Sequence, residues 1–115
     1  MKFFFSFLAL LAFSDVIAQQ DNSNNGEAVV LAQRIAKKMK DTLSLTGQQR
    51  QQIYQVNMSL HDQKQTIRQQ NPPQDSLQVR IQRVEQTRDS LYMPILGNEK
   101  YQLYLQKKRN LVSNN

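Results

Sequence analysis

One adjacent pair of side chains, His61-Asp62, is of the types that a catalytic or metal-binding site would use. Zinc sites in proteins need three or four N, S or O ligands, whereas the chain has one His and no Cys. Carboxylates that act as general acids or bases need burial to shift a pKa, and the acidic residues here are scattered. The sequence also lacks a glycine-rich phosphate loop and a nucleophile elbow. It therefore predicts a protein that is not an enzyme and binds no metal or cofactor.

A second group of side chains is suited to protein binding rather than catalysis. Tyr54, Met58 and His61 recur at spacings i, i+4 and i+7 beside the main apolar stripe of the same segment. Met is flexible and polarisable, which suits a surface that accepts varied partners. Either this stripe is a dimer interface or it faces bound client proteins; the simpler alternative is a wider buried helix face.

Arginines give a further candidate surface for clients or for a second copy. Val79 lies roughly opposite the apolar stripe of its segment and leads to Arg83 one turn later, while Arg80 and Arg88 add charge. Arginine stems can cover apolar segments of a partner while the guanidinium groups attract acidic ones. The alternative is an ordinary solvated helix face, which is the usual role of a run of charges.

Four segments with helical periodicity must position these side chains, at residues 27–43, 47–70, 75–93 and 98–112. Apolar residues mark one face of each segment: Leu31, Ile35, Met39 and Leu43; Ile53, Val56, Leu60 and Ile67; Leu77, Ile81, Val84 and Leu91; Tyr101, Tyr104, Leu105, Leu111 and Val112. Pro72-Pro73 ends the second segment, and Pro94 and Gly97 separate the third from the fourth. The predicted fold class is all-α, with four helices.

The N-terminus predicts export. Lys2 gives a positive start, residues 3–13 form an apolar run interrupted only by Ser6, and Val16-Ile17-Ala18 offers small residues for cleavage after Ala18. As a helix the run rises only about 16 Å, short of a bilayer core of about 30 Å. We expect a cleaved signal peptide at 1–18 and a periplasmic location, with secretion as second choice. The polar segments 19–26 and 113–115 are expected to be disordered.

The remaining chain has a weak potential core. Residues 19–115 contain no Phe, Trp or Cys, and a chain this short buries only about 60% of its unfolded surface. Small exported domains commonly add disulfides or metals. Because this chain has no Cys for either purpose, oligomerisation is the expected source of further burial.

The charge balance raises two other classes of partner. The net charge is +6 and the pI about 9.8, which is compatible with anionic lipids or nucleic acid. Export argues against nucleic acid. Binding to a membrane surface would need one continuous basic amphipathic helix, whereas the cations here are spread over all four segments.

The segment Leu45-Thr46-Gly47-Gln48-Gln49 predicts a helix start. Thr46 is a suitable N-cap, and Gln49 lies three residues later, where its side chain can return a hydrogen bond to the cap backbone. Such a capping box stabilises a helix start by about 1 kcal/mol. Leu45 is expected to pack into the interface between helices.

These five residues resemble the LTXXQ motif of the Spy/CpxP family of periplasmic helical proteins. The family's second copy lies near the start of the last helix, where this chain has Ile95-Leu96-Gly97-Asn98-Glu99-Lys100-Tyr101. Leu96 is kept, but Gly97 and Lys100 stand where Thr and Gln are expected. That departure puts the capping of the last helix in doubt.

The resemblance implies a bent helical hairpin that pairs into an antiparallel, cradle-like homodimer, with the domain at residues 27–112. It also implies ATP-independent binding of unfolded clients on a basic, amphipathic surface, as in a chaperone-like or envelope-stress protein. Some relatives bind zinc, for which this chain lacks the usual ligands. The alternative function is a structural or regulatory adaptor with one specific partner protein in the envelope.

Overall fold

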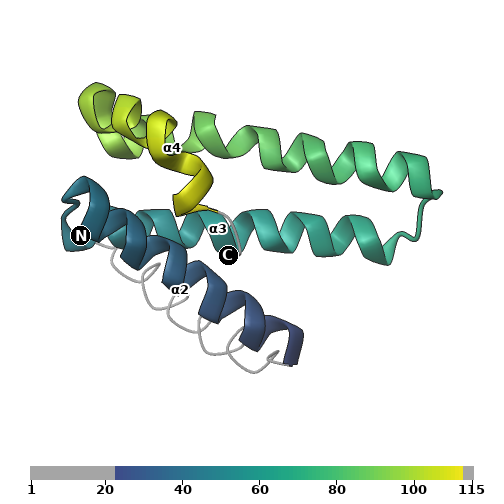
Figure 1. The fold of residues 1–115 in the computed structure, drawn as a ribbon. Helices are drawn as coiled ribbons and strands as arrows, with labels where there is room; N and C mark the ends of the chain where they lie inside the picture. The colour runs from purple at the N-terminus through teal and green to yellow at the C-terminus, as the bar shows by residue number, and fades with distance from the viewer. Residues whose placement is uncertain (1–22, 113–115) are drawn as a thin grey trace, which may run out of the picture.

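The computed structural model describes residues 23–112, which form three helices: α2 (Ser23–Leu43), α3 (Gly47–Gln69) and α4 (Gln74–Leu111) (Figure 1). The described part contains no strand, so the all-α prediction is confirmed there. The predicted signal peptide and the tail at 113–115 lie outside the described residues. α2 begins within the segment 19–26 that was expected to be disordered. Within residues 23–112, none of the helices is both long enough and apolar enough to cross a membrane.

The predicted third and fourth helices are not separate elements. Both lie in α4, whose only interior residue with non-helical backbone angles is Gly97, at φ 79° and ψ 166°. Pro94 lies inside the helix three residues before this break. It removes one amide donor and its ring crowds the carbonyl four residues earlier, which weakens the helix at this point. The break therefore bends α4 without adding a loop, so the described chain has three helices, the last of them kinked, where four were predicted. We call residues 74–96 the N-terminal limb of α4 and residues 98–111 its C-terminal limb.

The three helices enclose their core at one end of the molecule. α3 and the N-terminal limb of α4 form a long antiparallel hairpin; α2 crosses one half of α3, and the C-terminal limb turns back toward α2 over that same half (Figure 1). Most of the buried apolar side chains gather there: Ile35, Ala36, Met39, Leu43, Leu45, Ile53, Tyr92, Leu96, Tyr104 and Leu111. We call this cluster and the helix segments around it the three-helix end.

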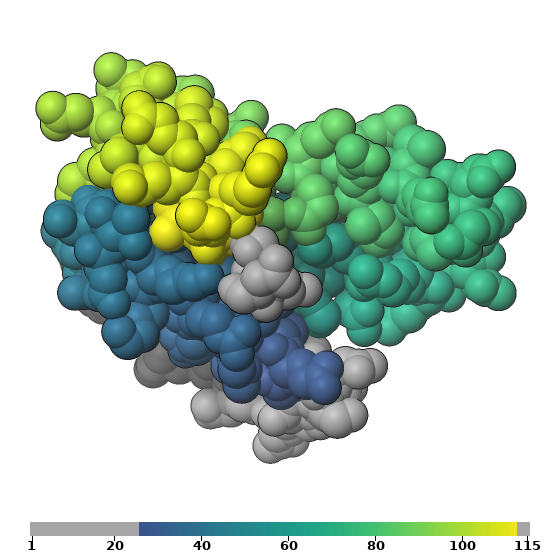
Figure 2. Space-filling model, viewed as in Figure 1, coloured from purple at the N-terminus to yellow at the C-terminus, as the bar shows by residue number. Residues whose placement is uncertain are grey.

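The other end of the hairpin, residues 61–83, is thin, and we call it the hairpin tip. Only α3 and α4 reach it, and it projects beyond the rest of the described chain in Figure 2. No side chain from position 61 to position 83 is buried. Ile67, Leu77 and Ile81 lie on the predicted apolar faces but stay only half-buried.

The predicted apolar faces are correct for α2 and α3 and partly wrong for α4. Leu91 and Leu105 were expected inside, but their exposed fractions are 41% and 37%. Tyr92, next to Leu91 in the chain, is fully buried instead. Its ring packs edge-on against Tyr104, with the centroids 5.0 Å apart. Two large aromatic side chains bury more area than two leucines, which decides the face that α4 turns inward near its bend.

Candidate functional site

The predicted capping box at the start of α3 is confirmed. Thr46 has extended backbone angles, and its Oγ1 accepts a hydrogen bond from the Gln49 amide at 3.0 Å. The Gln49 side-chain oxygen in turn accepts from the Thr46 amide at 2.9 Å. Two amide donors that the helix itself leaves without acceptors are thus satisfied.

The two motif segments meet in space. The Gln49 side-chain amide also donates to the Ile95 carbonyl at 2.9 Å, just before the bend of α4. Lys100, just after the bend, donates from Nζ to the Ser44 carbonyl at 2.7 Å. Leu45, as predicted, packs into the helix interface, in the same buried cluster as Leu96. The motif residues therefore tie the α2–α3 turn to the bend of α4, which is a structural role.

The second segment has Gly97 where the LTXXQ motif would have Thr, and the backbone at this position accounts for the glycine. Its φ of 79° and ψ of 166° lie in a region that is essentially restricted to glycine. A Cβ at this position would meet no atom within 4 Å, so the backbone alone demands glycine. A threonine cap could not adopt this conformation, and Lys100 makes a bond across to the turn instead.

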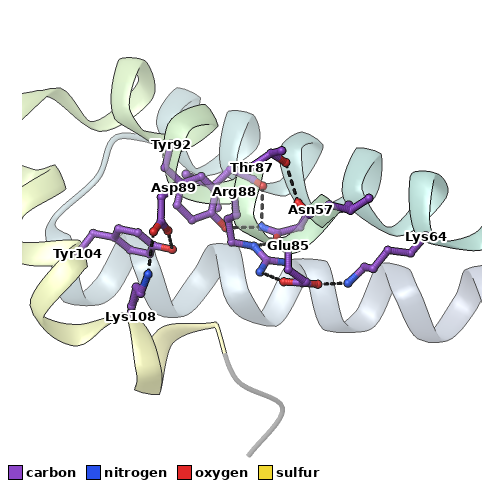
Figure 3. Close-up of polar contacts among 11 residues, drawn as sticks. Asn57, Lys64, Glu85, Thr87, Arg88, Asp89, Tyr92, Tyr104 and Lys108 are labelled. Carbon is purple, nitrogen blue, oxygen red and sulfur yellow. Dashed lines mark hydrogen bonds and ion pairs between the residues drawn. The ribbon is translucent and has the colours of Figure 1, made fainter. Parts of the chain in front are cut away.

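A polar network joins α3 to both limbs of α4 (Figure 3). At its centre Asn57 is buried: its Nδ2 donates to the Ile53 carbonyl at 2.9 Å and to the Tyr92 hydroxyl at 2.8 Å. Its Oδ1 accepts from Arg88 Nε at 3.2 Å. One amide side chain thus satisfies polar groups on both helices of the hairpin, as buried groups require. Burial is also the main cause that raises the pKa of Tyr92.

Toward the hairpin tip the network continues through ion pairs. Glu85 pairs with Arg88 on its own helix and with Lys64 of α3. Burial alone would raise the pKa of Glu85, but the two cations outweigh it and hold that pKa below its ordinary value. The pair with Lys64 joins the base of the hairpin tip to α4.

Toward the bend the network reaches the C-terminal limb. Asp89 accepts hydrogen bonds from the Tyr104 hydroxyl at 2.9 Å and from Lys108 Nζ at 2.7 Å. Burial opposes ionisation of Asp89, yet Lys108 and Tyr104 together lower its pKa. Burial and the neighbouring carboxylate raise the pKa of Tyr104. Asp89 therefore holds the two limbs of α4 together across the bend.

The predicted binding residues fall into separate groups. Arg80 and Arg83 are exposed on the hairpin tip, and Val79 beside them is 54% exposed. Arg88 was predicted to lie on the same surface, but its side chain is only 12% exposed because it bonds inside the network. It is a structural residue, so placing it on a client surface was wrong.

The stripe of Tyr54, Met58 and His61 is partly buried throughout. Tyr54 packs against the buried cluster of the three-helix end, which favours the wider buried face for that residue. The Nε2 atom of His61 is buried and has no hydrogen-bond partner. Across the residues that the structure describes, no three His, Cys, Asp or Glu side chains gather into a metal-binding group.

An open groove runs along the hairpin tip. It is lined by Arg68 from α3 and by Leu77, Gln78, Ile81, Gln82 and Glu85 from α4. Its apolar residues are half-buried and its rim is polar or charged. Together with the exposed Val79, this gives the tip apolar area beside several cations.

Sequence reasoning missed the polar network, although a signal for it is present. Asn57 lies one turn from Ile53 and three residues before Leu60, which places an amide on the apolar face of α3. Arg88 interrupts the apolar face of α4 in the same way. Polar residues at core positions of two neighbouring helices need partners, so the two interruptions could have been paired with each other.

Comparisons with known proteins give no independent support for a family. No family model matches the chain, and neither the curated proteins nor the solved structures include a significant match. The resemblance to the Spy/CpxP family thus depends on Leu45, Thr46 and Gln49, and it remains a hypothesis.

Proposed function

We propose that this protein is an exported, non-enzymatic, ATP-independent chaperone-like protein that holds unfolded clients on its hairpin tip. One observation carries the proposal. The tip contains four apolar residues beside three exposed cations, namely Ile67, Leu77, Val79, Ile81, Arg68, Arg80 and Arg83, and none of these side chains is buried. The fourth cation, Lys64, is paired with Glu85. At the tip neither α2 nor the C-terminal limb of α4 covers this apolar area, and cations lie beside it. Val30, Leu91, Met93 and Leu105 are also exposed, outside the tip.

The chemistry of the tip matches an unfolded chain better than a folded partner. Four cations against two carboxylates, Asp62 and Asp75, leave residues 61–83 with a net charge of +2. Glu85 offsets one of these charges through its pair with Lys64, and the remaining positive charge attracts acidic segments. Long arginine stems can cover apolar side chains of a client while their charged heads stay in water. Half-buried Leu77 and Ile81 in an open groove offer shallow, adaptable contact. Each of these contacts is weak, and none requires a particular client sequence.

The rest of the proposal follows from the sequence. The predicted signal peptide supports a periplasmic location. The resemblance to the Spy/CpxP family supports an antiparallel, cradle-like homodimer and a role as a chaperone-like or envelope-stress protein. A second copy would supply burial that a short chain without Cys lacks. Partners are therefore unfolded proteins and a second copy of the chain, without nucleic acid and with a membrane surface as a lesser candidate.

Aggregation of denatured proteins tests the proposal directly. We expect a stoichiometric amount of the protein to suppress light scattering from several unrelated denatured clients without ATP. The double variant Arg80→Ala/Arg83→Ala should lose most of this effect. Lys107→Ala/Arg109→Ala is the matched control, because it removes two exposed cations from the C-terminal limb; it should keep the effect.

Other outcomes would replace the proposal. A folded protein that suppresses no aggregation contradicts it and favours the adaptor with one specific partner. Equal loss in both double variants would show that net charge, rather than the tip, attracts clients. Co-sedimentation with anionic liposomes that disappears at high salt would instead favour a membrane surface as the partner.

A further inference from the structure

The bend of α4 is confined to one residue. Helical backbone continues on both sides, and within α4 only Gly97 departs from helical angles. If Gly97 took helical angles, α4 would become one continuous helix of 38 residues, about 57 Å long at 1.5 Å per residue, with Pro94 inside it. The C-terminal limb would then be carried away from its own α2 and α3. Gly97 is therefore the natural hinge of this limb.

The C-terminal limb is bound mainly by contacts that do not depend on the link through Gly97. Its side chains Tyr104 and Leu111 are buried, with exposed fractions of 1% and 3%. Lys38 of α2 donates from Nζ to the carbonyl of Asn110 at 2.9 Å. Tyr104 and Lys108 both bond Asp89 of the other limb. The same limb from a second molecule could make every one of these contacts.

We propose that the C-terminal limb exchanges between two copies of the chain: α4 straightens at Gly97, and each copy's limb completes the three-helix end of the other. This exchange is independent of the proposed function and differs from the cradle-like dimer. A second copy is the occupant that the contacts specify, because only the same sequence supplies the two buried side chains and the three hydrogen-bonding groups in register. Exchange keeps these contacts and relieves the glycine-only backbone conformation at Gly97 in both copies. This relief offsets part of the free-energy cost of association.

Alanine at the hinge tests the proposal. Gly97→Ala disfavours the bent backbone and favours the helix. Gly47→Ala is the matched control: a Cβ at either glycine meets no atom within 4 Å, and only Gly97 has a positive φ. With protein expressed from the full-length sequence, light scattering coupled to size exclusion should show a dimer association constant raised about 100-fold by Gly97→Ala, roughly tenfold for each hinge. Gly47→Ala should leave it unchanged.

Cross-linking distinguishes exchange from pairing of intact copies. The chain has no Cys, so Lys38→Cys and Asn110→Cys provide a unique pair at positions that are in contact. With a short bismaleimide, exchanged dimers should give covalently linked dimers on a denaturing gel. Intact copies, whether free or paired side by side, should give only monomers linked within one chain. A folded Gly97→Ala protein that is monomeric, or dimeric with links only within chains, would overturn the proposal.

A second comparison covers the case in which Gly97→Ala does not fold, as judged by circular dichroism. The protein that keeps Gly97 and carries the same cysteine pair is then cross-linked at increasing concentration. A variant with two extra glycines after Gly97 is treated in the same way. A longer hinge lets each limb fold back on its own chain and so disfavours exchange. Links between chains that rise with concentration and vanish on insertion support exchange. Links within chains alone, in both proteins, would overturn it.

Discussion

The two ends of the hairpin are built from similar residues and yet differ in burial. Within α3, Ile53 at the three-helix end is fully buried, while Ile67 at the hairpin tip is half-exposed. Both lie on the same predicted apolar face of one helix. The difference comes from the neighbours: α2 and the C-terminal limb of α4 cover the first half of α3, and neither covers the second half (Figure 1).

This contrast shows how a thin helical protein can leave apolar area available without losing its fold. Apolar burial supplies most of the stabilisation of a small domain, and here the described buried cluster lies at one end. The polar network of Asn57, Arg88 and Glu85 lies between the three-helix end and the hairpin tip. Beyond it, the tip has secondary structure but little core. Its stability should be correspondingly local.

The largest expected effect is a difference between two identical substitutions. Ile53→Ala should lower the free energy of unfolding by about 4 kcal/mol, because it leaves a cavity in a buried cluster. Ile67→Ala should lower it by about 1 kcal/mol, since solvent already reaches that side chain. Urea denaturation followed by circular dichroism measures both. Equal losses would mean that the tip is covered in solution, for instance by a second copy.

Next in size is the loss of the central amide. Asn57→Leu removes the acceptor of Arg88 Nε and the donor to the Tyr92 hydroxyl, both in a largely buried setting. We expect the free energy of unfolding to fall by about 2 to 3 kcal/mol. A double-mutant cycle with Tyr92→Phe isolates the shared hydrogen bond. An unchanged or raised stability would show that an apolar contact serves as well, and that the network is dispensable.

Acid should lower stability by a smaller amount, through protonation of two carboxylates in the polar network. Glu85 and Asp89 have folded-state pKa values below their ordinary values of 4.5 and 3.8, because cations and hydrogen bonds outweigh burial. A lowered pKa stabilises the fold at any pH above the ordinary value, and that contribution disappears as the pH falls through the folded-state value. Since the Glu85 side chain is 35% exposed, the effect should be smaller than that of Asn57→Leu.

Hydrogen exchange measures this loss residue by residue. Below about pH 4.5, amides of the hairpin tip should lose protection before those of the three-helix end, after correction for the intrinsic pH dependence of exchange. Glu85→Gln should show the weaker tip already at neutral pH and little further change there in acid, because Glu85 is the carboxylate that pairs with Lys64 of the tip. Uniform loss across both ends would place the acid-sensitive groups elsewhere.

The sequence predicted local features well because their causes are local. The capping box needs only Thr46 and Gln49, and the end of α3 needs only Pro72-Pro73. The bend was expected near Gly97, although a helix boundary rather than a one-residue break was predicted there. Whether a helix continues across a glycine depends on what the far limb packs against, and this is a tertiary property.

The network and the thin tip depend on partners distant in the chain. Asn57 contacts Arg88, and Tyr104 contacts Asp89. Periodicity marks Asn57 and Arg88 as interruptions that need partners, but it gives no such signal for Tyr104 and Asp89. Arg88 was nevertheless predicted on a surface, and Leu91 in the core. The half-burial of Ile67 could not be predicted either, because it follows from where α2 crosses α3.

A smaller effect concerns the cap that begins α3. Thr46→Ala should lower the free energy of unfolding by about 1 kcal/mol, because the Gln49 amide loses its acceptor. Thr42→Ala is the matched control, since Thr42 is an exposed residue in the last turn of α2 and should change stability little. Thermal melts compare the two. Gln49→Ala should cost more than Thr46→Ala, as it also breaks the bond to Ile95 at the bend; the reverse order would disconnect the motif from the bend.

The smallest predicted effects concern two turns: the one between α2 and α3 at the three-helix end, and the one between α3 and α4 at the hairpin tip. Ser44 follows α2 with a φ of 58°, and Asn71 follows α3 with a φ of 53°. The Leu45 amide bonds back to the Lys40 carbonyl at 3.1 Å, so Ser44 holds the left-handed position of a helix C-terminal motif where glycine is preferred. Ser44→Gly should raise the free energy of unfolding by up to about 1 kcal/mol, because relief of the backbone strain exceeds the added freedom of the unfolded chain. Asn71→Gly should give a smaller gain, since asparagine tolerates this conformation better than serine does.

If both variants gain equally in urea denaturation, strain at these turns is set by the backbone alone. If Ser44→Gly instead loses stability, the Ser44 hydroxyl has a role that its backbone angles do not reveal.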